Sequence, residues 1–319
     1  MAAKKIVTIV GATGAQGKGV VAGFIDDPAY QVRAITRNPA SEAGKALAAQ
    51  GAEVVAADLN DVASIKAAFA GSHIIYGVTN FFEPFIAHQS PVKAVEVEVQ
   101  QGLNLAAAAA ATPTLEHYIW STLPNVQAIT AGKYSVPHFD GKNAVDAHIR
   151  ADPALRAKAT FLWVTWYHSN YVFPMFTPYW IPTAGKHIQF ANYAPDTPIT
   201  TIGDVTANVG AFVRAIVEHP AETQGARTVI AAQSTVGAED LLQLWARTKG
   251  TKAQFVRVGG EAFREIWPLW AAEMGVMMEF WDEYRERSWT IEGETVVTGE
   301  DLGVVGLKGL EESFKEFEL

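Results

Sequence analysis

Three glycines near the N-terminus, Gly11, Gly14 and Gly17, have the spacing of a loop that binds the pyrophosphate of a dinucleotide. Such a loop brings phosphate groups against backbone N–H groups at the start of a helix, where the helix dipole favours negative charge. A Cβ atom would hold the phosphates away, so this chemistry needs glycine. We expect cofactor contacts from Gly11, Thr13, Gly14, Ala15, Gln16 and Gly17.

Two other interpretations of the glycine loop are a tight turn without a ligand and a P-loop. Five residues separate Gly11 from Gly17, and Lys18 is followed by Gly19. A P-loop would carry Ser or Thr after the lysine to hold magnesium, so the P-loop interpretation fails.

Arg37 indicates which dinucleotide would bind. It lies 20 residues after Gly17, where an acidic side chain would bind the ribose 2′-hydroxyl of NAD. A guanidinium instead matches a phosphate through two parallel hydrogen bonds, so the sequence predicts NADP(H). Asn38 is expected beside it, and Lys45 could assist. The alternative is that Arg37 is an ordinary solvated arginine.

Further candidate cofactor residues follow the third and fourth predicted strands. Asp58 and Leu59 are placed to meet the adenine, and Thr79, Asn80 and Phe81 to lie beside the pyrophosphate and the nicotinamide ribose. These positions are expected because ligands of open α/β sheets bind at the carboxyl ends of the strands.

The elements that must position these residues alternate between strand and helix. Apolar runs predict strands at Ile6–Val10, Gln31–Thr36, Glu53–Ala57, His73–Val78, His117–Ser121 and Thr160–Val164. Helical spacing predicts helices at Gly17–Ile25, Ser41–Gln50, Val62–Ala70 and Val92–Ala111, the third capped by Asp61. This alternation predicts an α/β fold with a doubly wound parallel sheet of the Rossmann type.

Composition changes after Val164. Aromatic residues crowd the next segment, interleaved with prolines: Trp163, Trp166, Tyr167, Tyr171, Phe173, Phe176, Tyr179 and Trp180. They would either pack a core or line a pocket for a flat, apolar substrate. Beyond them we expect a strand at Thr228–Ala231, a helix at Ala238–Thr248, a strand at Gln254–Val258 and helices from Glu261 to Arg287. Residues 1–165 are predicted to form the NADP-binding core. Residues 166–319 would complete the sheet and form a smaller α+β lobe.

Composition narrows the function classes. The 319 residues are 49% hydrophobic and carry a formal net charge of −9, which argues against direct binding of nucleic acid or anionic membranes. With no cysteine, disulfides, thiolate catalysis and zinc–thiolate sites are excluded. The eight histidines show no metal-ligand spacing, and no Gly-x-Ser-x-Gly elbow is present.

We find neither a signal peptide nor an apolar stretch long enough to span a membrane, so we expect a cytoplasmic protein, with the nucleus as an alternative.

Several motifs together resemble the NmrA-like family of atypical short-chain dehydrogenase/reductases. They are Gly-Ala-Thr-Gly-Ala-Gln-Gly at 11–17, Thr-Arg-Asn-Pro at 36–39, Ala-Asp-Leu at 57–59, Val-Thr-Asn at 78–80 and His-Phe-Asp-Gly-Lys at 138–142. The resemblance implies an NADP-binding Rossmann domain with a small C-terminal lobe. It also implies one of two functions, because some members resemble reductases of small molecules and others resemble redox sensors that regulate a protein partner.

The resemblance assigns roles to three further residues. Short-chain dehydrogenases use a Tyr-x-x-x-Lys pair, and here Lys142 matches the lysine that holds the nicotinamide ribose. His138 stands where the tyrosine would be. It would donate the proton itself, or be structural, with Tyr167 or Tyr134 supplying the proton instead. A helix from Tyr134 to Lys142 would need to include Pro137.

The wider superfamily implies that Ser121, beside Thr122, orients a substrate carbonyl. Trp166 and Asn170 follow the sixth strand, where the nicotinamide carboxamide would lie. We therefore predict an NADPH-dependent reductase of a small aromatic or apolar molecule. The alternative is a non-catalytic NADP sensor that binds a regulatory partner such as a transcription factor.

Overall fold

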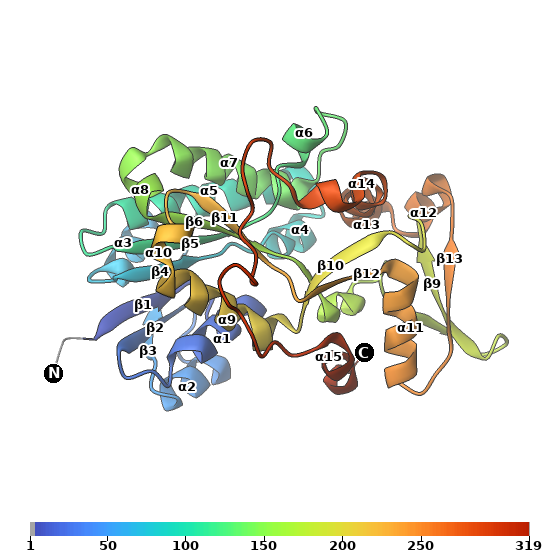
Figure 1. The fold of residues 1–319 in the computed structure, drawn as a ribbon, viewed down its shortest axis with the longest axis horizontal. Coiled ribbons are helices and arrows are strands. Elements are labelled where there is room, and N and C mark those ends of the chain that lie inside the picture. The colour runs from blue at the N-terminus through green and yellow to red at the C-terminus, as the bar shows by residue number, and fades with distance from the viewer. Residues whose placement is uncertain (1–3, 319) are drawn as a thin grey trace.

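A seven-stranded parallel sheet is the centre of the protein (Figure 1), whose computed structural model describes residues 4–318. Its strands are β1 (Lys5–Ile9), β2 (Tyr30–Thr36), β3 (Glu53–Ala56), β4 (Ile74–Gly77), β5 (His117–Thr122), β6 (Ala159–Val164) and β11 (Arg227–Ala231). Their order is β11-β6-β5-β4-β1-β2-β3, and every neighbouring pair is parallel. The chain winds outward from β1 in both directions, which confirms the predicted doubly wound sheet.

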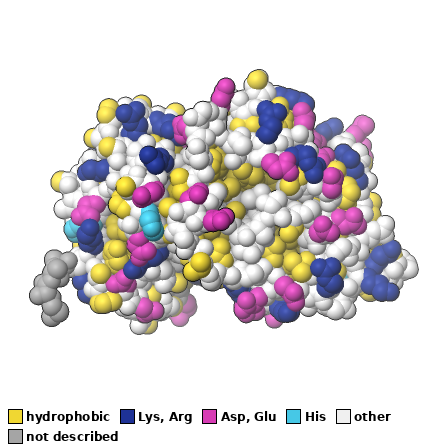
Figure 2. All heavy atoms as spheres, in the orientation of Figure 1, with side chains coloured by type: hydrophobic (Ala, Val, Ile, Leu, Met, Phe, Trp, Pro, Cys, Tyr) yellow, Lys and Arg dark blue, Asp and Glu magenta, His cyan; other side chains and the backbone are white. Residues whose placement is uncertain are grey.

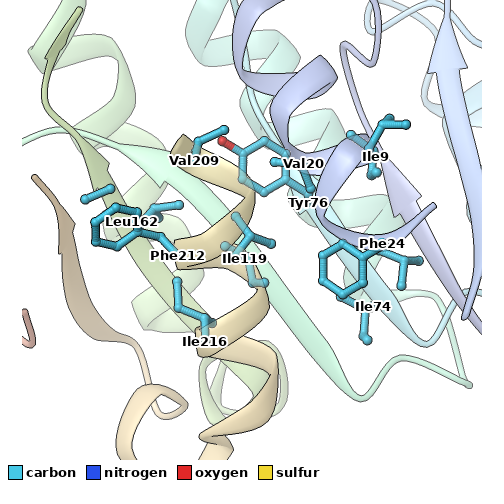
Figure 3. Close-up of a cluster of buried hydrophobic side chains, with 14 of the residues drawn as sticks. Ile9, Val20, Phe24, Ile74, Tyr76, Ile119, Leu162, Val209, Phe212 and Ile216 are labelled. Atoms are coloured by element: carbon cyan, nitrogen blue, oxygen red, sulfur yellow. The ribbon is translucent and has the colours of Figure 1, made fainter. Parts of the chain in front are cut away.

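Helices cover both faces of this sheet because side chains alternate along each strand. One face packs on α1 (Ala15–Phe24), α2 (Glu42–Ala49) and α9 (Val205–Glu218); the other packs on α3 (Val62–Phe69), α5 (Pro91–Ala110) and α7 (Pro137–Ala151). Figure 3 shows the first face, where Ile74, Tyr76 and Ile119 meet Phe24 and Phe212. As predicted, Asp61 caps α3, accepting a hydrogen bond from the backbone of Ala63.

Glycines allow α1 and α9 to pack closely. A Cβ atom on Gly210 would overlap the carbonyl oxygen of Gly19, and one on Gly23 would lie 3.0 Å from the carbonyl oxygen of Gly210. Asp204 caps α9, accepting hydrogen bonds from the backbone of Thr206 and Ala207. The helix that carries the glycine loop is therefore held by a segment nearly 200 residues later in the chain.

The rest of the chain forms a smaller lobe with two three-stranded sheets, in the orders β12-β10-β7 and β13-β9-β8. Its strands are β7 (Trp166–Tyr167), β8 (Tyr179–Ile181), β9 (Lys186–Ala191), β10 (Pro198–Gly203), β12 (Ser234–Gly237) and β13 (Ala253–Arg257). Its helices are α11 (Ala238–Thr248), α12 (Gly260–Ile266), α13 (Pro268–Trp270), α14 (Val276–Tyr284) and α15 (Leu310–Glu316), with a π-helical turn, η2 (Ala271–Gly275), between α13 and α14. Many of the crowded aromatic residues lie in this lobe's core.

Several elements were not among those predicted. They are α9, β7 to β10, β12, α15 and the short α4 (Phe82–His88), together with α6 (Val126–Ile129), α7, α8 (Pro153–Lys158), α10 (Pro220–Thr223), and the 3₁₀ turns η1 (His168–Val172) and η3 (Arg285–Trp289). The predicted strand at Thr228–Ala231 exists as β11, and it pairs with β6 in the main sheet.

Candidate functional site

The predicted cofactor residues follow consecutive strands at one edge of the main sheet. The glycine loop follows β1, Arg37 follows β2, Asp58 and Leu59 follow β3, and Thr79 to Phe81 follow β4. Parallel strands end at the same edge, and the strand order reverses between β1 and β4. That reversal is where open α/β sheets bind ligands.

The glycine loop has the geometry that close approach of a ligand requires. Gly11 has φ of +62°, a left-handed conformation that favours glycine, and its carbonyl oxygen accepts a hydrogen bond of 2.8 Å from the Gly14 N–H. A Cβ atom on Gly17 would overlap that same carbonyl. Helix α1 begins at Ala15, so its first N–H groups lie at this loop, while Thr13 is partly buried and Gly14 and Ala15 are exposed.

Arg37 makes a two-pronged ion pair with Glu83 of α4. Its Nη1 and Nη2 lie 2.5 and 3.0 Å from the two carboxylate oxygens. Hydrogen bonding to the Glu83 carboxylate raises the pKa of Arg37 further above its ordinary value. The guanidinium side chain is 69% exposed, so a phosphate can reach it. The Glu83 carboxylate accepts the two parallel hydrogen bonds from the guanidinium that a phosphate would accept.

The other predicted cofactor residues at this edge make local turns. Asn38, Asp58 and Asn80 are exposed, and each accepts a hydrogen bond from the backbone two residues later. Leu59 is partly buried, and its carbonyl accepts from Asn104. Phe81 is buried, and its ring stacks on Phe85.

Lys142 lies on α7 and is ion-paired in the interior. Its Nζ lies 2.8 Å from Glu98 of α5 and 3.0 Å from the hydroxyl oxygen of Thr79. Glu98 is fully buried, and its second oxygen has no hydrogen-bond donor among the described residues. Gly141 leaves room for this carboxylate, since a Cβ there would come within 2.9 Å of it. Lys142 and Thr79, both predicted site residues, are thus brought together.

His138 lies one helical turn before Lys142 and is also buried. Its Nδ1 is hydrogen-bonded to Glu273 of the smaller lobe, and its backbone N–H donates to the same carboxylate oxygen at 3.2 Å. Its ring centroid lies 5.9, 5.6 and 4.6 Å from those of Phe81, Phe82 and Phe139.

Gln16 connects Tyr167 to the main sheet. Its amide nitrogen donates to the Tyr167 hydroxyl at 2.5 Å, while its amide oxygen accepts from the hydroxyls of Tyr76 and, at 2.8 Å, Ser121. Burial raises the pKa of Tyr167 to about 12, so its hydroxyl keeps its proton at neutral pH. The Gln16 side chain therefore links β4, β5 and β7 in this structure.

Three other predicted residues are placed away from these groups. Trp166 packs in the lobe core against Tyr171 and Phe176. Asn170 lies in η1, and its side chain makes no hydrogen bond within residues 4–318. Tyr134 cannot share a helix with Lys142, because α7 begins at Pro137; its hydroxyl donates to Glu283 instead.

An acidic residue on α7 lies beside the end of β5. Asp146 accepts hydrogen bonds from Trp120 Nε1 at 2.8 Å and from the Thr122 hydroxyl at 2.9 Å. Burial of its carboxyl raises the pKa of Asp146 to about 7, against the lowering effect of these two donors. Asp146 therefore titrates close to neutral pH.

A model of the NmrA-like family matches residues 3–312. The chain belongs to this family. The NmrA-like family domain-containing oxidoreductase hkm9 of Aspergillus hancockii is 27% identical over 263 residues, 80% of this chain and 75% of that protein. The solved structure of NmrA, a negative transcriptional regulator, in complex with NAD has a TM-score of 0.77 at 20% identity, covering 98% of this chain and 95% of that one. The NADPH-dependent quinone oxidoreductase QOR2 of Escherichia coli, complexed with NADPH, has a TM-score of 0.68 at 18% identity, covering 97% and 98%.

Glu83, Glu98 and Glu273 contact predicted site residues in this NmrA-like chain, and sequence reasoning missed all three. Glu98 could have been found, because it lies on the buried face of α5 with Ala94, Gly102 and Leu105. A carboxylate on such a face needs a hydrogen-bonding or charged partner, which here is Lys142. Glu273 gave no comparable signal, since a π-helical turn breaks the helical spacing around it.

The distribution of charged side chains on the surface agrees with the composition, in which acidic and basic residues are both frequent. Figure 2 shows Lys and Arg side chains interspersed with Asp and Glu over the visible face. No helix in residues 4–318 is long and apolar enough to cross a membrane. Within the same residues, no group of three or more His, Asp or Glu side chains could hold a metal ion.

Proposed function

We propose that this protein binds NADP(H) across the edge formed by β1 to β4 and reduces a small aromatic or apolar molecule. The observation that carries the proposal is that Lys142 and His138 lie one turn apart on α7, and that Lys142 donates a hydrogen bond to Thr79 in the loop after β4. The same helix therefore carries the lysine that would bind the cofactor and the histidine that would donate the proton.

The residues at the edge fit such a cofactor. A Cβ atom on Gly17 would overlap the carbonyl of Gly11, so glycine there permits the tight loop, and the start of α1 favours a pyrophosphate. Arg37 supplies a planar guanidinium for an additional phosphate. Lys142, next to Thr79, would hold a ribose hydroxyl, while Asp58 and Leu59 would flank the adenine.

When bound, the reduced cofactor would supply a hydride to the substrate. His138 would donate the matching proton from Nε2 to the substrate oxygen or nitrogen, and solvent would later return that proton. Tyr167 is less suited to this role, because its hydroxyl is engaged by Gln16. Aromatic rings around His138 would exclude water and favour a flat substrate.

NADPH oxidation by the purified protein, followed with a panel of quinones, enones, imines and ketones, tests the proposal. We expect turnover with at least one planar acceptor and loss of that turnover in Lys142→Met. An absence of turnover across the panel would contradict the reductase function.

The alternative function is a non-catalytic NADP sensor that binds a regulatory protein partner. Its support is that His138 replaces the usual tyrosine and that the fold resembles a negative transcriptional regulator. This function predicts that NADP(H) changes the affinity for the partner while no acceptor is reduced. Residence in the cytoplasm or nucleus remains a prediction under either function.

A further inference from the structure

The pair formed by His138 and Glu273 joins the two parts of the molecule inside the protein. His138 comes from α7 on the main sheet, and Glu273 comes from η2 in the smaller lobe, 135 residues later. Glu273 is 0% exposed, and one of its oxygens contacts both Nδ1 and the backbone N–H of His138. A carboxylate removed from water so completely needs a hydrogen-bonding or charged partner.

The remaining polar atoms of the pair make no hydrogen bonds among the described residues. The second oxygen of Glu273, Oε2, is buried and has no hydrogen-bond donor in residues 4–318. The Nε2 atom of His138 likewise makes no hydrogen bond to any described residue, although Nδ1 does. A carboxylate that accepts the Nδ1 proton fixes the orientation of the ring, and in the imidazolium form Nε2 also carries a proton that it can donate.

The π-helical turn accounts for the position of Glu273. Between α13 and α14 the backbone widens by one residue over Ala271–Gly275, with Ala272 exposed and Glu273 buried. Single π-turns of this kind distort a helix at some energetic cost and are frequent at functional sites. Here the distortion carries a carboxylate into the interior.

The rings around this pair define the kind of molecule that would approach it. Phe82 lies against Phe173, with ring centroids 5.2 Å apart, and Phe173 lies 5.4 Å from Trp270. These rings come from α4, from the end of η1 and from α13, and Phe82 also contacts His138. A planar aromatic acceptor could replace such ring contacts with its own.

We propose that Glu273 is the positioning residue of the catalytic site: its carboxylate accepts the Nδ1 proton of His138 and orients the imidazolium form of the ring, whose Nε2–H is donated to a planar aromatic acceptor. The inference rests on the proposed reductase function. In the reaction, the N–H bond at Nε2 of the imidazolium breaks and a bond from that hydrogen to the acceptor's oxygen or nitrogen forms, which leaves neutral imidazole protonated at Nδ1. The reduced nicotinamide is the hydride source, and the acceptor is reduced by two electrons.

Nitrogen-15 NMR of the histidine-labelled full-length protein tests the geometry without any substrate. The His138 signals are assigned from their absence in His138→Gln. We expect Nδ1 of His138 to carry a hydrogen-bonded proton in the unmodified protein, and this signal to be altered in Glu273→Gln. If Nδ1 is bare because a protonated Glu273 donates to it, the pair is structural packing between the lobes and the inference is overturned.

Steady-state kinetics with NADPH and the best acceptor test the consequence. Glu273→Gln keeps the side chain's shape, and we expect kcat to fall about tenfold or more with KM nearly unchanged. Glu279→Gln is the matched control. This substitution also removes a carboxylate from the smaller lobe, on α14. Because Glu279 contacts Asn192 and not His138, kcat should stay as in the unmodified protein. An unchanged kcat in Glu273→Gln overturns the inference.

The two measurements separate failure of this inference from failure of the proposed function. A protonated Nδ1 without turnover on any acceptor would contradict the reductase function, and with it the catalytic role of Glu273. Turnover with a bare Nδ1 would leave the reductase function standing and remove only the role of Glu273.

Discussion

At the scale of single residues, both proposed functions depend on Lys142, which forms an ion pair with Glu98. Both groups are buried, so neither can be removed without leaving the other uncompensated. The same lysine is expected to hold the nicotinamide ribose. Its effects on stability and on function can therefore be separated by substitution.

Lys142→Met should lower the free energy of unfolding by about 3–5 kcal/mol, because Glu98 would remain buried without its cation. The double variant Lys142→Met/Glu98→Gln should recover most of this loss, since the uncompensated charge is gone. Urea denaturation measures both. Neither variant should oxidise NADPH with an acceptor. Equal stability of the single and double variants would contradict the assigned pairing.

At the scale of elements, the contact of α1 with α9 positions the glycine loop. Gly210→Ala should lower the free energy of unfolding by about 1–3 kcal/mol, because the added methyl group would overlap the carbonyl of Gly19. Gly259→Ala is the control, since a Cβ there meets nothing within 4 Å. Thermal unfolding measures both variants. A Gly210→Ala protein as stable as its control would mean that the two helices are packed less closely than described.

The elements also show what the sequence alone could predict. The first six strands and the glycine loop could be predicted because each strand is a short apolar run followed by turn residues. Helix α9 was missed although its signals are readable: Asp204 caps it, and Val205, Val209 and Phe212 recur at helical spacing. By contrast, Arg37 and Glu83 were separated by two strands and two further helices, so their pairing depended on tertiary structure.

The candidate site was predictable only in part for the same reason. Strand ends located Arg37 and Thr79 near one sheet edge, the family resemblance added Lys142, and the contact of Thr79 with Lys142 agrees with both. The partner of His138 was not predictable, because Glu273 reaches it from another lobe through an irregular turn. Local patterns carry no information about such long-range contacts.

At the scale of the whole molecule, stability should depend on pH through Asp146. Burial raises the pKa of Asp146 from 3.8 to about 7 in the folded protein. The contribution of this group to the free energy of unfolding is therefore largest below pH 3.8, where Asp146 is protonated in both states, and it is lost as the pH rises through about 7. Between pH 5 and pH 8 this group alone should lower the free energy of unfolding by about 2–3 kcal/mol.

Asp146→Asn lacks this titration. Urea denaturation at pH 5 and pH 8 should therefore show a smaller decrease in stability for the variant than for the unmodified protein. A decrease of the same size in both proteins would assign the pH dependence to other groups.

The central claim concerns the whole molecule, namely that a nicotinamide dinucleotide with an additional phosphate lies across the carboxyl edge of the sheet against Arg37. Calorimetric titration with NADPH and with NADH tests it most directly. We expect NADPH to bind about tenfold more tightly than NADH, and Arg37→Ala to remove this preference. Glu83→Gln should bind NADPH at least as well as the unmodified protein, since the guanidinium loses its competing carboxylate. Failure to bind either dinucleotide, or equal affinity for both, would contradict the account.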